Sequence, residues 1–314
     1  MKQSDKSKHL LSLIRSGEPM TLGQRLRLVV YLSVPAIIAQ LSSIVMQYID
    51  ASMVGSLGAE ASASIGLVST TTWLFGGLCS AASTGFTVQV AHRIGAGDMQ
   101  GARAVLRQSF TAIVIWGLAV SVLGMSISTY LPYWLGGDVA IRHDASLYFF
   151  IFSLFLPALQ LSFLASGMLR CSGNMHVASL LGVSMCMLDV LLNFFLIFPT
   201  RYLSIGGYDV PIFGAGLGVG GAALGTVVAE SLVAAVMLWY LWYRSPELSL
   251  AKNKGCFRPK LDTIRKALRI GLPMGIEHTI ICCAQIMITV IVAPLGICAI
   301  AANSFAITLS LIHI

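Results

Sequence analysis

Charged residues are scarce in this sequence. Only 11% of its 314 residues are Asp, Glu, Lys or Arg, whereas hydrophobic residues make up 56% and the mean hydropathy is +0.83. Soluble globular domains carry about 25% charged residues, so the composition excludes an ordinary soluble domain. Apolar runs of about 20 residues, each long enough for one bilayer crossing, indicate a multi-pass membrane protein.

Two further features are missing. The seven cysteines lack metal-ligand spacing, and the Cys282–Cys283 pair is interpreted as packing, because cysteine behaves as a small hydrophobe in apolar segments. The first 27 residues are polar and basic, without the apolar core of a cleavable signal. No enzymatic activity and no cofactor are expected.

Apolar runs predict seven membrane spans and part of an eighth. They lie near residues 28–53, 62–90, 108–131, 145–168, 176–198, 214–242 and 267–292, with a further one from about 298. The wet connections carry turn residues, as at 95–98, 135–138, 171–174 and 206–209.

Basic residues gather on alternate connections. With the N-terminus inside, 18 of the 20 Lys and Arg residues are cytoplasmic, and only Arg142 and Arg201 lie outside. Because basic loops stay in the cytoplasm, a cytoplasmic N-terminus is expected. The net charge of +7 is therefore an orientation signal, and no nucleic-acid partner is expected.

The chain contains an internal repeat. A shift of 238 residues matches Arg27 with Arg265, Pro35 with Pro273, Leu57-Gly58 with Leu295-Gly296, and Ala61 and Ala63 with Ala299 and Ala301. Such repeats are typical of secondary transporters. Six helices separate the copies, which predicts two parallel six-helix lobes. The second lobe has barely begun at Ile314, so a C-terminally truncated chain is expected, in which helix 7 and the segment after it lack partners.

One charged group stands out at membrane depth. Asp50 is the only charged residue between Leu28 and Ala59. A carboxylate in a bilayer costs a few kcal/mol and usually faces a protein interior or a water-filled cavity. Asp50 is therefore interpreted as a functional group, with an interfacial acid at the outer rim as the alternative.

Five segments, in order, resemble the multidrug and toxic compound extrusion (MATE) transporters. Pro35 and Asp50 with Met53–Glu60 resemble helix 1 and its loop, and the other segments are Ile94–Gln108, Asn193–Phe198, Gly220–Thr226 and Gly271–Glu277. The resemblance implies two six-helix lobes around a central cavity. It also implies a bacterial cytoplasmic-membrane protein, monomeric when complete, that exports organic and often cationic compounds as Na⁺ or H⁺ enters.

The expected fold class is accordingly an all-α membrane protein. It consists of the first six-helix lobe of a twelve-helix MATE-like transporter, helix 7 and the start of helix 8. The expected segments are a cytoplasmic N-terminal segment 1–27, the first lobe 28–242, a basic cytoplasmic linker 243–266 and the start of the second lobe 267–314.

The resemblance also implies roles for individual residues. Asp50 matches the helix 1 acid that binds the coupling cation, and Pro35 matches a proline associated with helix bending. Asp189 and Asn193 match two polar positions of the first-lobe cation site, although some relatives have the acid and amide reversed. Thr226 matches a helix 6 hydroxyl, and Glu277 matches a second-lobe glutamate.

Physical chemistry supports a shared cation site. Asp189 and Asn193 are one turn apart on one helix face. With Asp50 and Thr226 they offer a set of oxygen ligands that suits Na⁺ or a proton and does not suit zinc. Two acids close together in a low dielectric also favour holding a proton between them. The same four residues therefore serve either ion.

Plainer interpretations remain open for several of these residues. Asn193 can be an ordinary interhelical hydrogen-bonding residue, and the Thr226 hydroxyl can bond its own helix. Pro35 can be a tolerated membrane-helix proline, and Glu277 with His278 can form a local polar patch. Glu230 has no assigned role.

Two other interpretations are rejected. The Gly216-x-Gly218-x-x-Gly221 pattern matches a dinucleotide fingerprint, but it opens an apolar helix and lacks an acid about 20 residues on; close helix packing is preferred. A retinal protein is disfavoured because helix 7 carries no suitable lysine.

Two functional alternatives remain besides export. A lipid-linked saccharide flippase of related fold would line its cavity with more cationic residues, whereas the charges here at membrane depth are acidic. The other alternative is an inactive truncated fragment.

Overall fold

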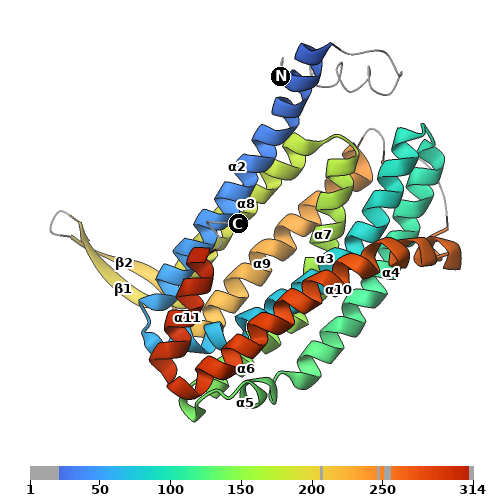
Figure 1. Cartoon of the computed structure of the whole chain (residues 1–314). Helices are drawn as coiled ribbons and strands as arrows, with labels where there is room; N and C mark the ends of the chain where they lie inside the picture. The colour runs from blue at the N-terminus through green and yellow to red at the C-terminus, as the bar shows by residue number, and fades with distance from the viewer. Residues whose placement is uncertain (1–20, 206–207, 246–247, 251–255, 311–314) are drawn as a thin grey trace.

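The computed structural model describes residues 21–205, 208–245, 248–250 and 256–310 (Figure 1). The helices in chain order are α2 (Leu22–Gly55), α3 (Ala59–Gly95), α4 (Met99–Ile127), α5 (Leu131–Trp134), α6 (Val139–Leu154), α7 (Leu156–Cys171), α8 (Met175–Ile197), α9 (Gly218–Trp239), η1 (Tyr240–Arg244), α10 (Leu261–Val292), η2 (Ala293–Leu295) and α11 (Ile297–Ser310). The strands β1 (Pro199–Ile205) and β2 (Tyr208–Ala215) lie between α8 and α9.

The predicted helical membrane fold is confirmed. Six of the described helices are long and apolar enough to cross a bilayer, and the bent pair α6–α7 makes a seventh span if counted as one. The eighth predicted span corresponds to the shorter apolar helix α11. The N-terminal basic residues up to Arg15 lie outside the described residues.

The fourth predicted span is a bent pair of helices. It breaks at Phe155, and α6 and α7 meet at an angle of 50°. Pro157 lies in the first turn of α7. Proline has no backbone N–H and its ring clashes with the preceding turn, so it starts a helix more readily than it continues one.

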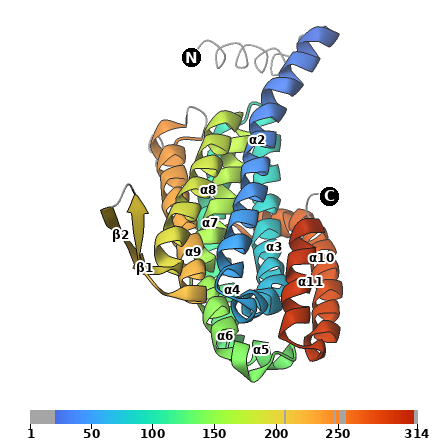
Figure 2. The ribbon, with the colours of Figure 1, turned by 90° about the vertical axis from the view of Figure 1, so that its left-hand side faces the viewer.

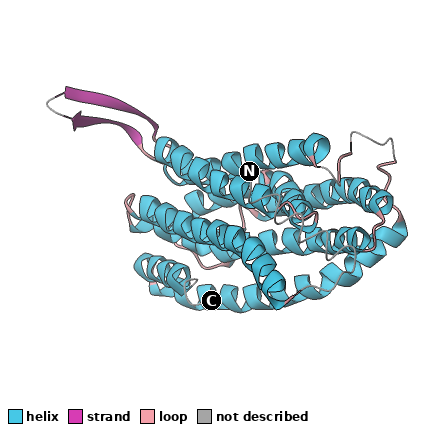
Figure 3. Cartoon of the chain, turned by 90° about the horizontal axis from the view of Figure 1, so that it is seen from above, coloured by secondary structure: helices cyan, strands magenta, loops and turns pink. Residues whose placement is uncertain are grey.

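A β-hairpin replaces the predicted loop before the sixth span. Strands β1 and β2 pair antiparallel, with Leu203 opposite Val210. Figure 3 shows the hairpin projecting from the helical bundle. The sixth span was predicted near residues 214–242; β2 runs to Ala215, and α9 begins at Gly218, four residues later than predicted. The turn residues 206–207 lie outside the described residues.

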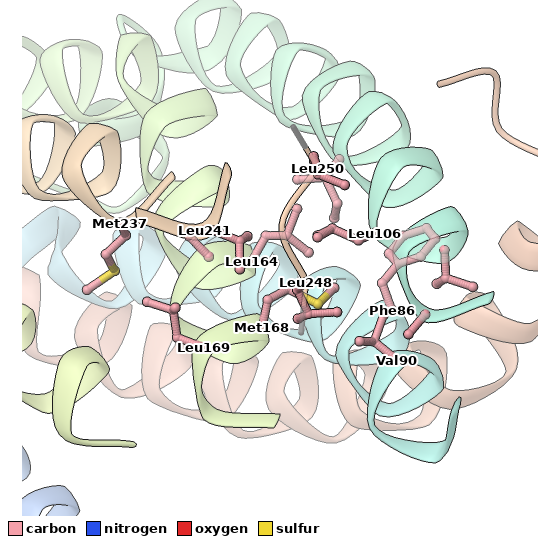
Figure 4. Packing of buried hydrophobic residues seen from close by; sticks show 14 of the residues in the cluster. Phe86, Val90, Leu106, Leu164, Met168, Leu169, Met237, Leu241, Leu248 and Leu250 are labelled. Atoms are coloured by element: carbon pink, nitrogen blue, oxygen red, sulfur yellow. The ribbon is translucent and has the colours of Figure 1, made fainter. Parts of the chain in front are cut away.

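The bundle is held together by two main clusters of buried apolar side chains. One cluster joins α3, α4, α7 and α9 with the segment after η1; Figure 4 labels its members Phe86, Val90, Leu106, Leu164, Met168, Leu169, Met237, Leu241, Leu248 and Leu250. The second cluster includes Leu67, Phe75 and Phe149, and it extends to Ala293 and Ile300 beyond α10.

Helix 7 and the following segment, expected to lack their second-lobe partners, make contacts with the first lobe. Both α10 and α11 pack along α3 (Figure 2). Small residues permit the close approach, since a Cβ atom at Gly271 would lie 2.6 Å from the Ala81 carbonyl oxygen. The opposite face of α10 stays exposed, with Leu272 and Ile280 58% and 64% exposed. Within the described residues, helix α10 therefore has one face packed on α3 and one exposed apolar face.

Candidate functional site

Three helices converge on the polar residues that the sequence singled out. Asp50 lies near the C-terminal end of α2, Asp189 and Asn193 lie on α8, and Thr226 lies on α9. Helix α8 packs against both α2 and α9.

The glycine-rich start of α9 brings it close to α8. A Cβ atom at Gly221 would lie 2.5 Å from the Leu196 carbonyl oxygen, and one at Gly225 would collide with the Asn193 Oδ1 atom. This close approach explains the glycine pattern as helix packing. The preceding strand β2 belongs to an antiparallel hairpin, so a dinucleotide-binding βαβ unit is not formed.

The Asn193 amide bridges the two acids. Its Nδ2 atom donates to Asp50 Oδ1 at 2.9 Å and to Asp189 Oδ2 at 3.3 Å. Asp189 and Asn193 are almost completely buried, at 0% and 1% exposed. The structure thus brings together three of the four predicted residues through direct hydrogen bonds.

Two oxygens of this cluster have no partner. Asp189 Oδ1 and Asn193 Oδ1 are buried and accept no hydrogen bond from the described residues. A buried polar atom without a partner costs about 1–3 kcal/mol. Each oxygen keeps a free lone pair for a proton or a cation, so the donor set fits the predicted coupling ion.

Thr226 is a neighbour of the cluster. Its side chain lies close to the Asp189 carboxylate. Its hydroxyl donates to the Ala222 carbonyl oxygen at 3.1 Å, which is the bond to its own helix that the sequence left open. A hydroxyl has a single hydrogen, so it can still offer a lone pair to a cation.

Tyr148 is a further polar residue near the cluster that was not predicted from the sequence. This half-buried tyrosine of α6 lies within electrostatic reach of both Asp50 and Asp189. A tyrosine has an apolar body and a polar tip, so it can sit in an apolar helix and still present a hydroxyl to a polar site. No local pattern in the sequence distinguishes Tyr148 from the other eight tyrosines.

Glu230, which had no assigned role, lies near the acidic cluster. It lies on α9 beside Ser162 of α7 and is near enough to Asp189 to interact electrostatically. The acidic residues of α9 and α8 therefore belong to one polar region between the helices.

Pro35 and Glu277 lie apart from this cluster. Pro35 is inside α2, which continues through it without a break. Glu277 is exposed on α10 and has no hydrogen-bond partner among the described residues, whereas the neighbouring His278 places Nε2 3.0 Å from the Trp73 carbonyl oxygen of α3. Their proposed roles in bending and in a second-lobe site stay predictions.

The ligand groups of the site decide whether it suits a transition metal. Among the described residues, no group of three or more His, Cys, Asp or Glu residues is placed to hold a metal ion. The oxygens around Asp189 come instead from two carboxylates, one amide and one hydroxyl. Such hard ligands suit Na⁺ or a proton.

The whole arrangement matches a known transporter family. The family model MatE matches residues 35–195, which is more than half of the chain and includes Asp50, Asp189 and Asn193. The chain belongs to the MatE family. Its helical bundle, with Asp50 of α2 and Asp189 of α8 joined through Asn193, is therefore a MatE transporter fold.

Individual relatives of the chain are multidrug resistance proteins by name. The "Probable multidrug resistance protein NorM" of Thermotoga maritima is 24% identical over 247 residues, covering 79% of this chain and 50% of that protein. The protein of the same name from Neisseria meningitidis serogroup B is 26% identical over 312 residues, covering 96% of this chain and 63% of that protein. The chain thus spans between half and two thirds of these relatives.

A solved MatE-type structure has the same fold. An inward-facing multidrug resistance MATE family transporter of the MOP superfamily superposes with a TM-score of 0.74 at 21% identity. The superposition covers 90% of this chain and 61% of that one. MatE membership and fold place this chain among multi-pass membrane transporters.

Proposed function

We propose that the protein containing this chain is an antiporter that exports organic compounds, often cationic, as Na⁺ or H⁺ enters. The Asp50–Asn193–Asp189 cluster carries the proposal, because it holds one half-buried and one buried acid and two buried oxygens without a partner among the described residues. Carboxylates in such positions mark ion and proton pathways. The names of the relatives, multidrug resistance proteins, support the substrate class.

The cluster suggests how an ion would be coupled to movement. Asp50 is on α2 and its amide partner Asn193 is on α8, so the hydrogen bond between them joins two helices. A proton or Na⁺ at the acids would neutralise their repulsion and compete with the Asn193 amide for the same oxygens. Ion binding would thereby change how α2 packs against α8. Helix α2 would then either move as a rigid helix or bend at Pro35.

The flippase alternative fits less well. The charged side chains of the polar region are Asp50, Asp189 and Glu230, all acidic. An anionic pyrophosphate head group would be repelled by them, whereas an organic cation would be attracted.

We further propose that the protein works as a monomer in the bacterial cytoplasmic membrane.

Gradient-driven efflux tests this function. Vesicles containing the protein are loaded with a fluorescent organic cation such as ethidium, and Na⁺ and pH gradients are imposed separately. Efflux should follow one of the two gradients and stop when an ionophore collapses it. Efflux that ignores both gradients, or none under either, would contradict the proposal.

A native cysteine tests the proposed orientation. Cys256 is exposed in the segment between η1 and α10. In a variant that keeps only this cysteine, a membrane-impermeant maleimide should label it from the cytoplasmic side alone, because the segment is basic. Cysteine introduced at Val139, which is 75% exposed at the start of α6, should be labelled from outside alone. The reverse pattern would overturn the topology.

A further inference from the structure

A basic cleft lies between α3 and α10, away from the buried acids. It has a volume of about 410 Å³ and is formed by the C-terminal end of α3, the residues after it and the first turns of α10. Its polar lining includes His92, Arg93, Lys266 and Arg269. No role in export has been assigned to any of these residues.

The walls of the cleft are fixed by contacts. The Gln89 Nε2 atom of α3 donates to the Thr263 carbonyl oxygen of α10 at 3.1 Å. One turn earlier on α3, a Cβ atom at Gly85 would collide with the Ala267 carbonyl oxygen. The two helices therefore meet closely beside the cleft.

Only some of the positive charge is neutralised within the protein. Arg93 Nη1 pairs with Asp98 Oδ2 at 2.7 Å. The Gly101 backbone N–H and this Arg93 guanidinium hold the pKa of Asp98 below its usual range, so Asp98 stays ionised. Arg93 and Asp98 thus compensate each other.

Lys266 and Arg269 remain available. Lys266 Nζ lies 3.4 Å from Asp262 Oδ2, but both side chains are well exposed, and exposed pairs of this spacing are weak. Arg269 has no hydrogen-bond or ion-pair partner among the residues that the structure describes. The cleft therefore offers net positive charge to an anion.

Apolar surface continues from the cleft along α10. Ile270 lines the cleft itself. Ile276 and Ile280 follow Arg269 at helical spacing on the same face, and they are 51% and 64% exposed. Since α10 is long and apolar enough to cross a bilayer, these exposed side chains are suited to contact with acyl chains. The surface is amphipathic, with an anion-binding end and an apolar extension.

We propose that this cleft binds the phosphate head group of an anionic phospholipid, with the acyl chains lying along the exposed face of α10. Basic clefts between membrane helices bind anionic head groups in this way. The lipid would contact α3 and α10 together and hold the seam between them. This inference needs only the membrane-spanning fold, and it stands whether or not the protein exports drugs.

Thermal unfolding of the purified protein in non-ionic detergent tests the proposal. Phosphatidylglycerol should raise the midpoint in a saturable way, while phosphatidylcholine with the same acyl chains should not. Inorganic phosphate at the same concentration should have little effect, because it lacks the acyl chains. An equal rise with phosphate would assign the site to soluble anions, and an equal rise with phosphatidylcholine would exclude head-group selection; either result overturns the proposal.

Paired charge-removal variants locate the site. Each Lys or Arg near an anionic membrane surface contributes about fivefold in affinity, so Lys266→Gln with Arg269→Gln should weaken phosphatidylglycerol binding about 30-fold. The matched control is Arg258→Gln with Arg265→Gln, two exposed basic residues outside the cleft lining. An equal loss in both double variants would show nonspecific charge attraction and refute the site. If the first double variant does not fold, Lys266→Gln alone should still weaken binding about fivefold.

Discussion

Replacing Asp50 by Asn should abolish cation-coupled efflux while the protein still inserts into the membrane. The substitution keeps the shape of the side chain but removes its negative charge. The carboxylate oxygen that accepts a hydrogen bond from Asn193 Nδ2 at 2.9 Å is thereby replaced by a neutral amide group. Asp189→Asn should have nearly the same effect. A single carboxylate leaves too little negative charge to hold a partly dehydrated cation or to carry a proton.

The neighbouring residues should follow in a graded order. Asn193→Ala should be milder, because it removes a neutral ligand and the bridge between the acids, worth on the order of 1 kcal/mol per hydrogen bond. Thr226→Val should be milder still, since its hydroxyl already bonds the Ala222 carbonyl oxygen. Efflux rates under imposed Na⁺ and pH gradients measure the order.

A carboxylate elsewhere serves as the control. Asp144 is on α6, where it lies beside the exposed His143, and Asp144→Asn should leave efflux unchanged. Protein amounts in the membrane fraction must be equal for all variants. Wild-type efflux and ion dependence in Asp50→Asn would show that the intramembrane acid is structural, and the proposed coupling mechanism would be wrong.

The membrane spans were predictable because each one follows from a local property. An apolar run of sufficient length has to satisfy its backbone polar groups internally, and a helix does so. The face shared by Asp189 and Asn193 also follows from local helical spacing. Their meeting with Asp50, which is 143 residues from Asn193 in the sequence, came only from the family resemblance, because no local rule sets which helices are neighbours.

The features that sequence analysis missed depend on local breaks or on tertiary packing. Hydropathy averaged over about 20 residues is hardly changed by one proline, so the bend at Phe155 was not predicted. The same averaging does not resolve where β2 ends and α9 begins. The packing of α10 against α3 depends on Gly85 and Gly271 facing particular carbonyl groups, and Tyr148 is near the acids only because α6 lies beside α9.

Gly225→Ala should disable the site without removing any polar group from it. The added Cβ atom would collide with Asn193 Oδ1 and lie 3.1 Å from the Asn193 backbone nitrogen. Either the amide leaves its place between the acids or α9 moves away from α8. Overpacking of this kind costs about 1–3 kcal/mol, so both the thermal midpoint and gradient-driven efflux should fall. Gly76→Ala is the matched control, because no atom lies within 4 Å of its added Cβ.

A double variant separates the two ways in which Gly225→Ala can act. If the damage comes from the collision with the Asn193 side chain, removing that side chain relieves it. Gly225→Ala combined with Asn193→Ala should then melt close to the midpoint of Asn193→Ala alone, which is a non-additive result expected for residues in contact. Fully additive losses would instead mean that the new methyl group pushes α9 away through the backbone of α8. In that case the conformation of the Asn193 amide would not be what Gly225 protects.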